Sequence, residues 1–391
     1  MSHPSGHQPI LPGATLGILG GGQLGRMTAL AARSLGYQVR VLDPDPGCAA
    51  RPVVEHVLCA RFDDAAAAVE LASHCDVLTL EIEKLSCDGL RAAARHCPVR
   101  PAAEVLEIVQ DKARQKSWLA RHGFPVGPFR EARRCDELQA ALAGLGGRCF
   151  VKSATGGYDG RGQFETETPG DAAEAWTSLG GGPVVAEKAL ALEAEISILV
   201  ARSPSGELAV YPPALNHHED RILVWSLLPG PVVPGIAARA EEIGRELATK
   251  LRLEGLLAVE LFLVGGDLLV NELAPRPHNT FHHTEVACST SQFEQVVRAV
   301  CGLPLGSTEV MRPAAIANLL GPEGGPGAPF DRALAVPGTH LFLYGKRDAR
   351  AGRKMGHLTA FGSTPEEALA RVLEAKKRLS QGTHGNPAAR G

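Results

Sequence analysis

Two glutamates separated by a glycine turn are the first residues whose types and spacing suit chemistry. In LAVELFLVGGDLLVNELAPR, Glu260 and Glu272 lie on two predicted strands that turn at Gly265-Gly266-Asp267. A tight hairpin of this kind can place both carboxylates near one point. Mg²⁺ takes oxygen ligands and uses one or two carboxylates together with phosphates, so the pair predicts a Mg²⁺ and nucleoside triphosphate site. Solvated strand charges are the alternative, but burying unpaired glutamates among apolar neighbours would be costly.

A lysine ahead of a glycine-rich turn is the second feature. In VKSATGGYDGRGQF, Lys152 follows the apolar Val151 and precedes the glycines. Backbone N–H groups freed by glycine can close over phosphate oxygens, and a nearby lysine supplies a point charge. The order of the residues differs from the G-x-x-x-x-G-K-[ST] loop, because the lysine comes first and no helix follows. From the glycines alone, a plain hairpin turn with a surface lysine stays equally open.

A rigid polar cluster comes directly after the second glutamate. Arg276, His278 and Asn279 are held by Pro275 and Pro277, which stiffen the backbone between them. Arginine, histidine and asparagine side chains together suit a small anion such as bicarbonate or a carboxylate.

A basic run near the C-terminus, YGKRDARAGRKMGH, suits a phosphate on a substrate. The basic residues of this run are Lys346, Arg347, Arg350, Arg353 and Lys354. The alternative interpretation is a charged turn that is simply exposed to solvent. Elsewhere, His282 and His283 are adjacent, but neither has a partner at metal-site spacing, so they do not predict a metal centre.

The opening stretch TLGILGGGQLGRM reads as a strand, a glycine turn and a helix. Gly20, Gly22 and Gly25 match G-x-G-x-x-G, and Asp43 at the end of the next strand stands at a spacing that suits a dinucleotide. Nothing downstream supplies a hydride-transfer site, which weakens the interpretation as an NAD-dependent oxidoreductase. The glycines also expose N–H groups at a helix N-terminus, where an anion would be favoured.

The strands and helices that must position these residues are predicted to be arranged differently in three successive parts of the chain. Strand and helix patterns alternate β-α-β-α-β over 15–83, which predicts a parallel sheet with helices on both faces. The middle of the chain reads as α+β with an antiparallel sheet and hairpins. The last part, roughly 313–381, has strands around AIANLLG and THLFLYGK and ends in the helix TPEEALARVLEAKKRL.

Length and composition fit a globular protein of two or three domains. The 391 residues are 45% hydrophobic and 21% charged, with a net charge of −3, which argues against a nucleic-acid partner. No apolar run approaches the roughly 20 residues that span a bilayer, and the N-terminus lacks the pattern of a signal peptide. Nine scattered cysteines without a C-x-x-C pair indicate reduced thiols in a cytoplasm.

The chain resembles the ATP-grasp superfamily and, within it, the bacterial N5-carboxyaminoimidazole ribonucleotide synthase family. Five motifs carry the resemblance, in this order along the chain: GGGQLGRM, GGYDGRGQ, NELAPRPHN, STSQFEQ and GRKMGH. The resemblance runs from about Thr15 to about Leu379. It implies a ligase that joins bicarbonate to 5-aminoimidazole ribonucleotide in purine biosynthesis, through carboxyphosphate, with ATP and Mg²⁺ or Mn²⁺. It also implies a cytoplasmic homodimer with small-molecule substrates and no nucleic-acid or membrane partner.

The fold implied is an ATP-grasp fold of mixed α/β and α+β class. We expect an N-terminal Rossmann-like domain, a small ATP-grasp lid, a large ATP-grasp subdomain and a β-rich C-terminal region, with loose tails at 1–14 and 381–391. Their expected boundaries are 1–111, 112–187, 188–312 and 313–391.

Carried over position by position, the resemblance assigns four sets of site residues. ATP contacts fall on Lys112, Lys152, Gly157, Tyr158, Asp159, Gly160, Arg161, Gly162, Gln163, Glu187, Lys188, Ala189, Leu190, Glu195, His218, Asn271 and Glu272. The metal ligands are Glu260 and Glu272. Bicarbonate is handled by Arg276, His278, Asn279 and Lys346. The ribonucleotide and its phosphate fall to Gly22, Gln23, Leu24, Tyr158, Asp159, Arg161, Arg353 and Lys354.

Three positions depart from the family pattern. Phe281 stands where glycine is common and His283 where an aromatic residue is common, so we expect a changed floor of the substrate site. Lys84 stands where asparagine is frequent, although Glu81 and Glu83 of the same motif are present.

Two further interpretations are weighed against the carboxylating ligase. A different ATP-grasp ligase, such as a formate-using purine enzyme, shares Lys152 and the two glutamates but does not predict GGYDGRGQ together with GRKMGH. A non-catalytic scaffold is disfavoured by three separate charged clusters.

Overall fold

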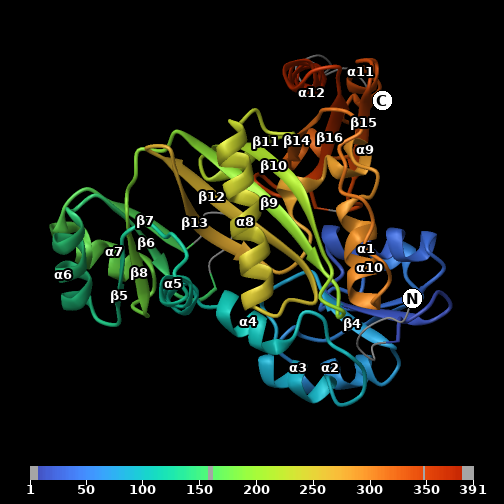
Figure 1. The fold of residues 1–391 in the computed structure, drawn as a ribbon, viewed down its shortest axis with the longest axis horizontal. Coiled ribbons are helices and arrows are strands. Elements are labelled where there is room, and N and C mark those ends of the chain that lie inside the picture. The colour runs from blue at the N-terminus through green and yellow to red at the C-terminus, as the bar shows by residue number, and fades with distance from the viewer. Residues whose placement is uncertain (1–7, 157–161, 347, 381–391) are drawn as a thin grey trace, which may run out of the picture.

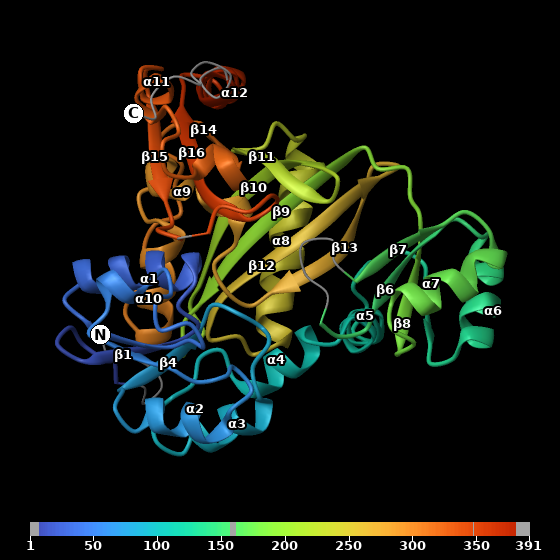
Figure 2. The same cartoon turned by 180° about the vertical axis from the view of Figure 1, so that it is seen from behind.

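The computed structural model describes residues 8–156, 162–346 and 348–380, which form three β-sheets with helices packed on them (Figure 1). A small sheet and its helices project to one side of the molecule in both views (Figure 2). The other two sheets and the C-terminal helix make up the main body. No helix within the described ranges is long and apolar enough to cross a lipid bilayer.

The N-terminal sheet is parallel, with strand order β3-β2-β1-β4, as the alternation of strand and helix patterns predicts. Its strands are β1 (Thr15–Leu19), β2 (Gln38–Leu42), β3 (His56–Leu58) and β4 (Val77–Leu80). The helical segments around it are α1 (Gln23–Ser34), η1 (Arg51–Val53), α2 (Ala65–Ala72), α3 (Cys87–Ala93) and α4 (Ala103–Val109). The next helix, α5 (Lys112–Arg121), lies beside the small sheet (Figure 1). The three-residue β3 was not predicted, because so short a strand carries no measurable alternation.

Local capping chemistry sets several of these helix boundaries. The Asp64 carboxylate accepts from the N–H groups of Ala66 and Ala67 at 2.9 and 3.1 Å at the start of α2. Asp111 does the same for Arg114 at 3.0 Å at the start of α5. Such caps satisfy N–H groups that have no partner within the helix.

The small sheet is antiparallel, with order β5-β8-β6-β7. Its strands are β5 (Phe129–Ala132), β6 (Cys149–Ser153), β7 (Gln163–Thr166) and β8 (Val184–Lys188). The segments α6 (Cys135–Leu145), η2 (Pro169–Asp171) and α7 (Ala172–Ser178) accompany it. The predicted strand that holds Lys152 is confirmed as β6, and Lys152 pairs with Gln163 of β7 across the glycine-rich connection.

The large sheet is antiparallel and runs β13-β12-β9-β10-β11-β14-β16-β15. Its strands are β9 (Ala194–Arg202), β10 (Leu208–Glu219), β11 (Ile222–Leu228), β12 (Gly255–Val264), β13 (Asp267–Ala274), β14 (Ala314–Leu320), β15 (Thr339–Leu343) and β16 (Lys354–Phe361). Its helical segments are α8 (Pro234–Lys250), η3 (Asn279–Phe281), α9 (Thr284–Ala287), α10 (Gln292–Cys301), η4 (Gly321–Gly324), α11 (Phe330–Leu334) and α12 (Pro365–Ser380). The C-terminal strands thus continue the sheet that carries the hairpin of the two glutamates.

The β12–β13 hairpin turns at Gly265-Gly266, as predicted. Both glycines have positive φ, +60° and +81°, which a two-residue turn of type I′ requires and which costs glycine little. At the other end of the sheet, the basic run is only partly a turn. Lys354 begins the strand β16, which is largely buried, so the interpretation of the whole run as a charged turn is wrong.

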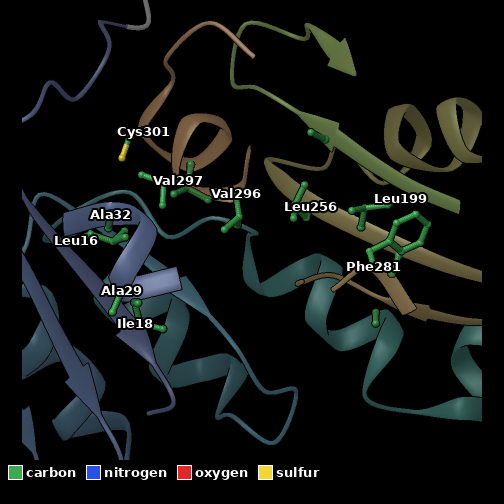
Figure 3. Close-up of a cluster of buried hydrophobic side chains, with 14 of the residues drawn as sticks. Leu16, Ile18, Ala29, Ala32, Leu199, Leu256, Phe281, Val296, Val297 and Cys301 are labelled. Atoms are coloured by element: carbon green, nitrogen blue, oxygen red, sulfur yellow. The ribbon is translucent and has the colours of Figure 1, made fainter. Parts of the chain in front are cut away.

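One hydrophobic core joins the N-terminal sheet to the large sheet. Leu16 and Ile18 of β1 and Ala29 and Ala32 of α1 face Val296, Val297 and Cys301 of α10 (Figure 3). Across α10 the same cluster continues into Leu199, Leu256 and Phe281. Burying these side chains removes apolar surface from water on both sides of the junction, so α10 fixes the N-terminal sheet relative to the glutamate hairpin.

Candidate active site

Glu260 and Glu272 face each other across the β12–β13 hairpin. A β-bulge shifts the register between Glu260 and Leu261: Leu261 pairs with Val270, whereas Glu260 pairs with Glu272. One extra residue, Asn271, is therefore inserted in β13, and its side-chain amide donates to the Glu260 carboxylate at 3.3 Å. Without the bulge, Glu260 would oppose Asn271 and not Glu272. The bulge gathers both residues of the Asn-Glu pair around Glu260.

The two carboxylates have different electrostatic surroundings. Burial raises the pKa of Glu260, and the neighbouring charge of Glu272 raises it further. Burial would also raise the pKa of Glu272, but the Lys112 ammonium, 2.9 Å from its carboxylate, lowers that pKa below the usual value. Two acidic groups at one point, one of them disfavoured as an anion, form a site that a cation would stabilise.

The donor atoms at this hairpin fit Mg²⁺. Besides the two carboxylates, the Asn271 side-chain oxygen is buried and accepts no hydrogen bond within the described part of the chain. All three are hard oxygen donors, which this ion prefers over nitrogen or sulfur. The described residues contain no group of three or more His, Cys, Asp and Glu side chains that could hold a metal, so the remaining ligands would come from phosphates and water.

Three lysines converge beside the hairpin from α5 and β6. Lys116 and Lys152 contact the two oxygens of Glu187 at 3.1 and 3.0 Å, and Lys112 contacts Glu272. Burial would raise the pKa of Glu187, but Lys152 and Lys116 lower it to about 2. Three ammonium groups around two carboxylates suit a polyphosphate that would take over some of these contacts. Lys116 was missed from sequence, although its i, i+4 spacing from Lys112 puts both on one face of α5.

Replacing Glu187 by glutamine should lower the free energy of unfolding by about 3 kcal/mol, because two largely buried ammonium groups lose their partner. Urea unfolding at neutral pH measures this. The pKa of Glu187 is depressed in the folded state, so its stabilisation is complete above the ordinary value of 4.5 and is lost as pH falls toward about 2. The difference from wild type should therefore shrink in acid. Glu219→Gln, at a carboxylate with 68% of its side chain exposed, should change little.

Glu195 and His218 form a second pair on the same sheet. They lie on the neighbouring strands β9 and β10, with the His218 ring 2.9 Å from the Glu195 carboxylate. Burial would lower the pKa of His218, but Glu195 raises it above the usual value. The structure thus brings together two of the predicted nucleotide contacts.

Other predicted ATP contacts are only partly placed. Gly157, Tyr158, Asp159, Gly160 and Arg161 lie outside the described residues. Gly162 accepts from the N–H of Ser153 at 2.9 Å, and Gln163 begins β7.

The segment after Glu187 already uses two of its backbone donors. The N–H of Lys188 donates to Pro128 and that of Ala189 to Arg148, at 2.9 and 3.0 Å. Leu190 lies next to Gly127. A base bound along this segment would therefore meet backbone groups other than these two N–H donors.

The anion cluster after β13 is paired with the N-terminal sheet. The Arg276 guanidinium lies 2.7 Å from the carboxylate of Glu83, beyond the end of β4. His278 lies 3.7 Å from Glu260. Burial lowers the pKa of His278 well below its usual value, and the charges of Arg276 and Lys354 lower it further. At neutral pH the structure thus presents one fixed cation and one neutral imidazole side by side.

Asn279 completes this cluster. Both polar atoms of its side-chain amide are buried, and neither finds a hydrogen-bond partner among the described residues. Because leaving buried polar atoms unpaired is costly, such an amide fits a position that meets a ligand.

In the glycine-rich loop before α1, backbone N–H groups already donate to carboxylates of the protein itself. The N–H groups of Gly22 and Gly25 both donate to the carboxylate of Glu81, and the N–H of Gly21 donates to Asp43 at 2.9 Å. The expectation that these N–H groups stand free for an anion is wrong, because an internal carboxylate already occupies the helix N-terminus. Asp43, the residue that would hold a dinucleotide ribose, is used in the same way, which removes the main support for NAD.

The side chains of Leu24 and Gln23, in this loop, have different surroundings. Leu24 is buried against Phe293 and Tyr344, so its side chain faces the core and not a substrate. Gln23 instead accepts from the Lys346 ammonium at 2.5 Å, which joins the loop to the C-terminal region.

The basic run divides into two environments. Lys346 also donates to the backbone carbonyl of Lys354 at 2.8 Å. Lys354 is close enough to His278 to lower the pKa of that imidazole. Arg353 instead lies 3.6 Å from the Asp348 carboxylate in the turn before β16, with a third of its side chain exposed. Lys354 thus lies near the His278 imidazole and Lys346 connects this strand to Gln23, whereas Arg353 pairs within its own turn.

The side chains at 281 and 283, two of the departures from the family pattern, are buried. The Phe281 side chain is fully buried and packs into the core beside Tyr211 and Leu199 (Figure 3). His283 is also fully buried, edge-on to Phe281, with Nε2 3.3 Å from the Ser226 hydroxyl. Both side chains therefore pack inside the protein, where they could act on a bound substrate only through the residues that cover them. Lys84 is exposed next to Glu83.

Three family models together match most of the chain. An ATP-grasp domain matches residues 117–293, a ribonucleotide synthetase preATP-grasp domain matches 13–110, and a phosphoribosylaminoimidazole carboxylase C-terminal domain matches 314–371.

Curated relatives and solved structures agree with these matches. The N5-carboxyaminoimidazole ribonucleotide synthases of Bacillus subtilis and Brucella melitensis are each 40% identical to the chain, over 94% and 90% of it and 97% of each relative. An ADP complex of an N5-carboxyaminoimidazole ribonucleotide synthetase aligns with a TM-score of 0.90 and 37% identity over 96% of this chain and 99% of that one. The Aspergillus clavatus synthase with ADP and 5-aminoimidazole ribonucleotide aligns at 0.86 and 31%, over 94% and 99%.

Proposed function

The chain belongs to the N5-carboxyaminoimidazole ribonucleotide synthase family of ATP-grasp ligases, and from this premise we propose how its side chains divide the reaction. The enzyme catalyses the ATP-dependent carboxylation of 5-aminoimidazole ribonucleotide to N5-carboxyaminoimidazole ribonucleotide in purine biosynthesis. The observation that carries the proposal is the convergence of an acidic hairpin, a lysine cluster and an Arg-His-Asn cluster on one edge of the large sheet.

The triphosphate of ATP lies, in this proposal, between the small sheet and the β12–β13 hairpin. Lys112, Lys116 and Lys152 would turn from their carboxylate partners to phosphate oxygens. Glu195 and His218 would meet the ribose side of the nucleotide. Glu260 and Glu272, with the Asn271 oxygen, would hold Mg²⁺, which when bound neutralises charge on the phosphates. We further propose that residues 112–187 act as a lid over the nucleotide and that 188–312 form its base.

Bicarbonate is assigned to the cluster of Arg276, His278 and Asn279. A bicarbonate oxygen attacks the γ-phosphorus, the bond to ADP breaks, and the bicarbonate proton is released. Arg276 stabilises the anion, and the neutral imidazole of His278 supplies a hydrogen bond to it. Because phosphoryl transfer depends chiefly on positioning and charge stabilisation, these fixed groups suffice without a protein nucleophile.

The amine of the ribonucleotide then attacks the carboxyl carbon of carboxyphosphate, or the CO₂ released from it. The new C–N bond forms, the C–O bond to phosphate breaks, and the amine loses a proton. We assign Lys346 to closing the bicarbonate site, and Lys354 and the side chain of Gln23 to the ribonucleotide. Tyr158, Asp159, Arg161 and Arg353 remain proposed contacts to it.

The test of this function is the dependence of ADP release on each substrate. With ATP, Mg²⁺ and bicarbonate present, ADP release should require 5-aminoimidazole ribonucleotide, and the carboxylated product should appear in equal amount. A formate-using ligase would instead release ADP with formate in place of bicarbonate. ADP release that does not respond to the ribonucleotide would contradict the proposal.

The assembly and cellular location are also proposed from family membership. We propose a homodimer in the cytoplasm, with small-molecule substrates and neither nucleic acid nor membrane as partner. Sedimentation at working concentration tests the dimer.

A further inference from the structure

A buried amide on α10 holds the backbone of His278 from both sides. Gln292 is the first residue of α10 and is fully buried. Its side-chain oxygen accepts from the N–H of His278 at 2.8 Å, and its side-chain nitrogen donates to the carbonyl of His278 at 2.9 Å. The two peptide groups that flank a Cα set the direction of its side chain. Gln292 therefore fixes the direction in which the His278 side chain leaves the backbone, and the Thr280 hydroxyl, 2.9 Å from Nδ1, holds the ring.

The orientation of the Gln292 amide is determined by its partners. Its second N–H faces Nδ1 of His282 at 3.1 Å. A flipped amide would place its nitrogen against the N–H of His278 and its oxygen against a carbonyl, so only one orientation satisfies the backbone of His278.

The same residue holds the far end of the loop. The backbone N–H of Gln292 donates to the Thr284 hydroxyl at 3.0 Å, and that hydroxyl donates to the carbonyl of Phe281 at 2.6 Å. Ser226 donates to the carbonyl of Thr280 at 2.9 Å. The loop of 278–284 is therefore fixed to α10 and β11, and α10 is anchored in the core by Val296 and Val297.

We propose that Gln292 is a positioning residue for the carboxylation, which acts by fixing the backbone of His278 so that its imidazole faces Glu260 and the bound bicarbonate. The inference rests on the proposed role of His278 in handling bicarbonate. The proposal gives the STSQFEQ segment a function in the reaction: because α10 is anchored in the core, this segment holds the backbone of the proposed anion site in place.

The first test is Gln292→Met, which keeps the length of the side chain but removes its hydrogen bonds. Misplaced supporting groups typically cost 10–100-fold, so kcat/KM for bicarbonate should fall about 30-fold. The KM for ATP should stay unchanged, because the lysine cluster does not touch Gln292. Gln292→Asn keeps the amide but cannot reach both backbone groups of His278. It should likewise lower kcat/KM for bicarbonate and leave the KM for ATP unchanged, and it replaces the methionine variant if that variant does not fold.

Gln295 supplies a matched control on the same helix. It is also fully buried, and its amide likewise holds one residue from both sides: it accepts from the N–H of Gly306 and donates to the carbonyl of Gly306, both at 2.8 Å. Gln295→Met removes equivalent bonds away from the site. It should lower stability while leaving kcat/KM of the folded enzyme unchanged.

The second test combines Gln292→Met with His278→Ala. If Gln292 acts through His278, its substitution lowers kcat/KM no further once the imidazole is absent. An additive loss, or equal losses in Gln292→Met and Gln295→Met, would overturn the inference. If Gln292→Met keeps full activity while His278→Ala loses activity, the inference about Gln292 is wrong but the proposed role of His278 stands. Full activity of His278→Ala would remove the proposed role of His278 and the inference with it.

Discussion

Replacing Glu272 by glutamine should lower kcat/KM for ATP about a thousand-fold, which corresponds to roughly 4 kcal/mol of transition-state stabilisation. Glu272 contributes an ionised carboxylate to the proposed Mg²⁺ site and also holds the Lys112 ammonium at 2.9 Å. Glutamine keeps the shape of the side chain but provides a weaker, neutral ligand. ADP release under saturating ribonucleotide and bicarbonate measures the loss.

The dependence on Mg²⁺ separates the two roles of Glu272. If its main task is to bind the metal, Glu272→Gln should need a much higher Mg²⁺ concentration for half-maximal rate. Lys112→Met should raise the KM for ATP without changing that requirement. Asp267→Asn, at the exposed turn of the same hairpin, is the control and should behave as wild type. A folded Glu272→Gln enzyme with near-normal ATP turnover would show that the metal assignment is wrong.

The glutamate hairpin shows how far sequence alone reaches into this site. The alternation of apolar residues and the Gly265-Gly266 turn predict both strands and the nearness of the two carboxylates, because a two-residue turn fixes the strand register. They do not predict the bulge at Asn271, since an inserted residue leaves no signal in a short alternating pattern. The nearness of the two carboxylates was predicted from sequence, whereas the residue that pairs with Glu260 is seen only in the structure.

Other features escaped prediction because they depend on long-range packing. Glu81 fills the N–H groups of Gly22 and Gly25 from 59 and 56 residues away, and local sequence does not report such a contact. The core position of Phe281 depends in the same way on Tyr211. The charges around Lys354 hid the strand β16, because polar residues at the start of a strand obscure its period. Family resemblance supplied the residue roles, but not which loops turn inward.

The Arg276 site gives the second large effect. Arg276→Met should lower kcat/KM for bicarbonate about a thousand-fold, because the anion loses its fixed cation in a site of low dielectric. It also leaves Glu83, 2.7 Å away, without its ion-pair partner. Breaking such a pair costs about 3 kcal/mol or more of stability when it is largely buried. Arg276→Lys should recover part of the stability but less of the activity, since an ammonium lacks the planar, multiply donating geometry of guanidinium.

Stability and catalysis at Arg276 separate in a double variant. Adding Glu83→Gln to Arg276→Met removes the unpaired carboxylate, so the urea midpoint should recover while kcat/KM for bicarbonate stays low. Arg100 is the matched control: its guanidinium lies 2.7 Å from Glu254 and its side chain is only 8% exposed. Arg100→Met should lose comparable stability yet keep the kcat/KM of the folded enzyme, because this pair lies away from the proposed bicarbonate cluster. Activity that returned together with stability in the double variant would make Arg276 a structural residue, and the bicarbonate would then need another cation, for which Lys346 is the nearest proposal.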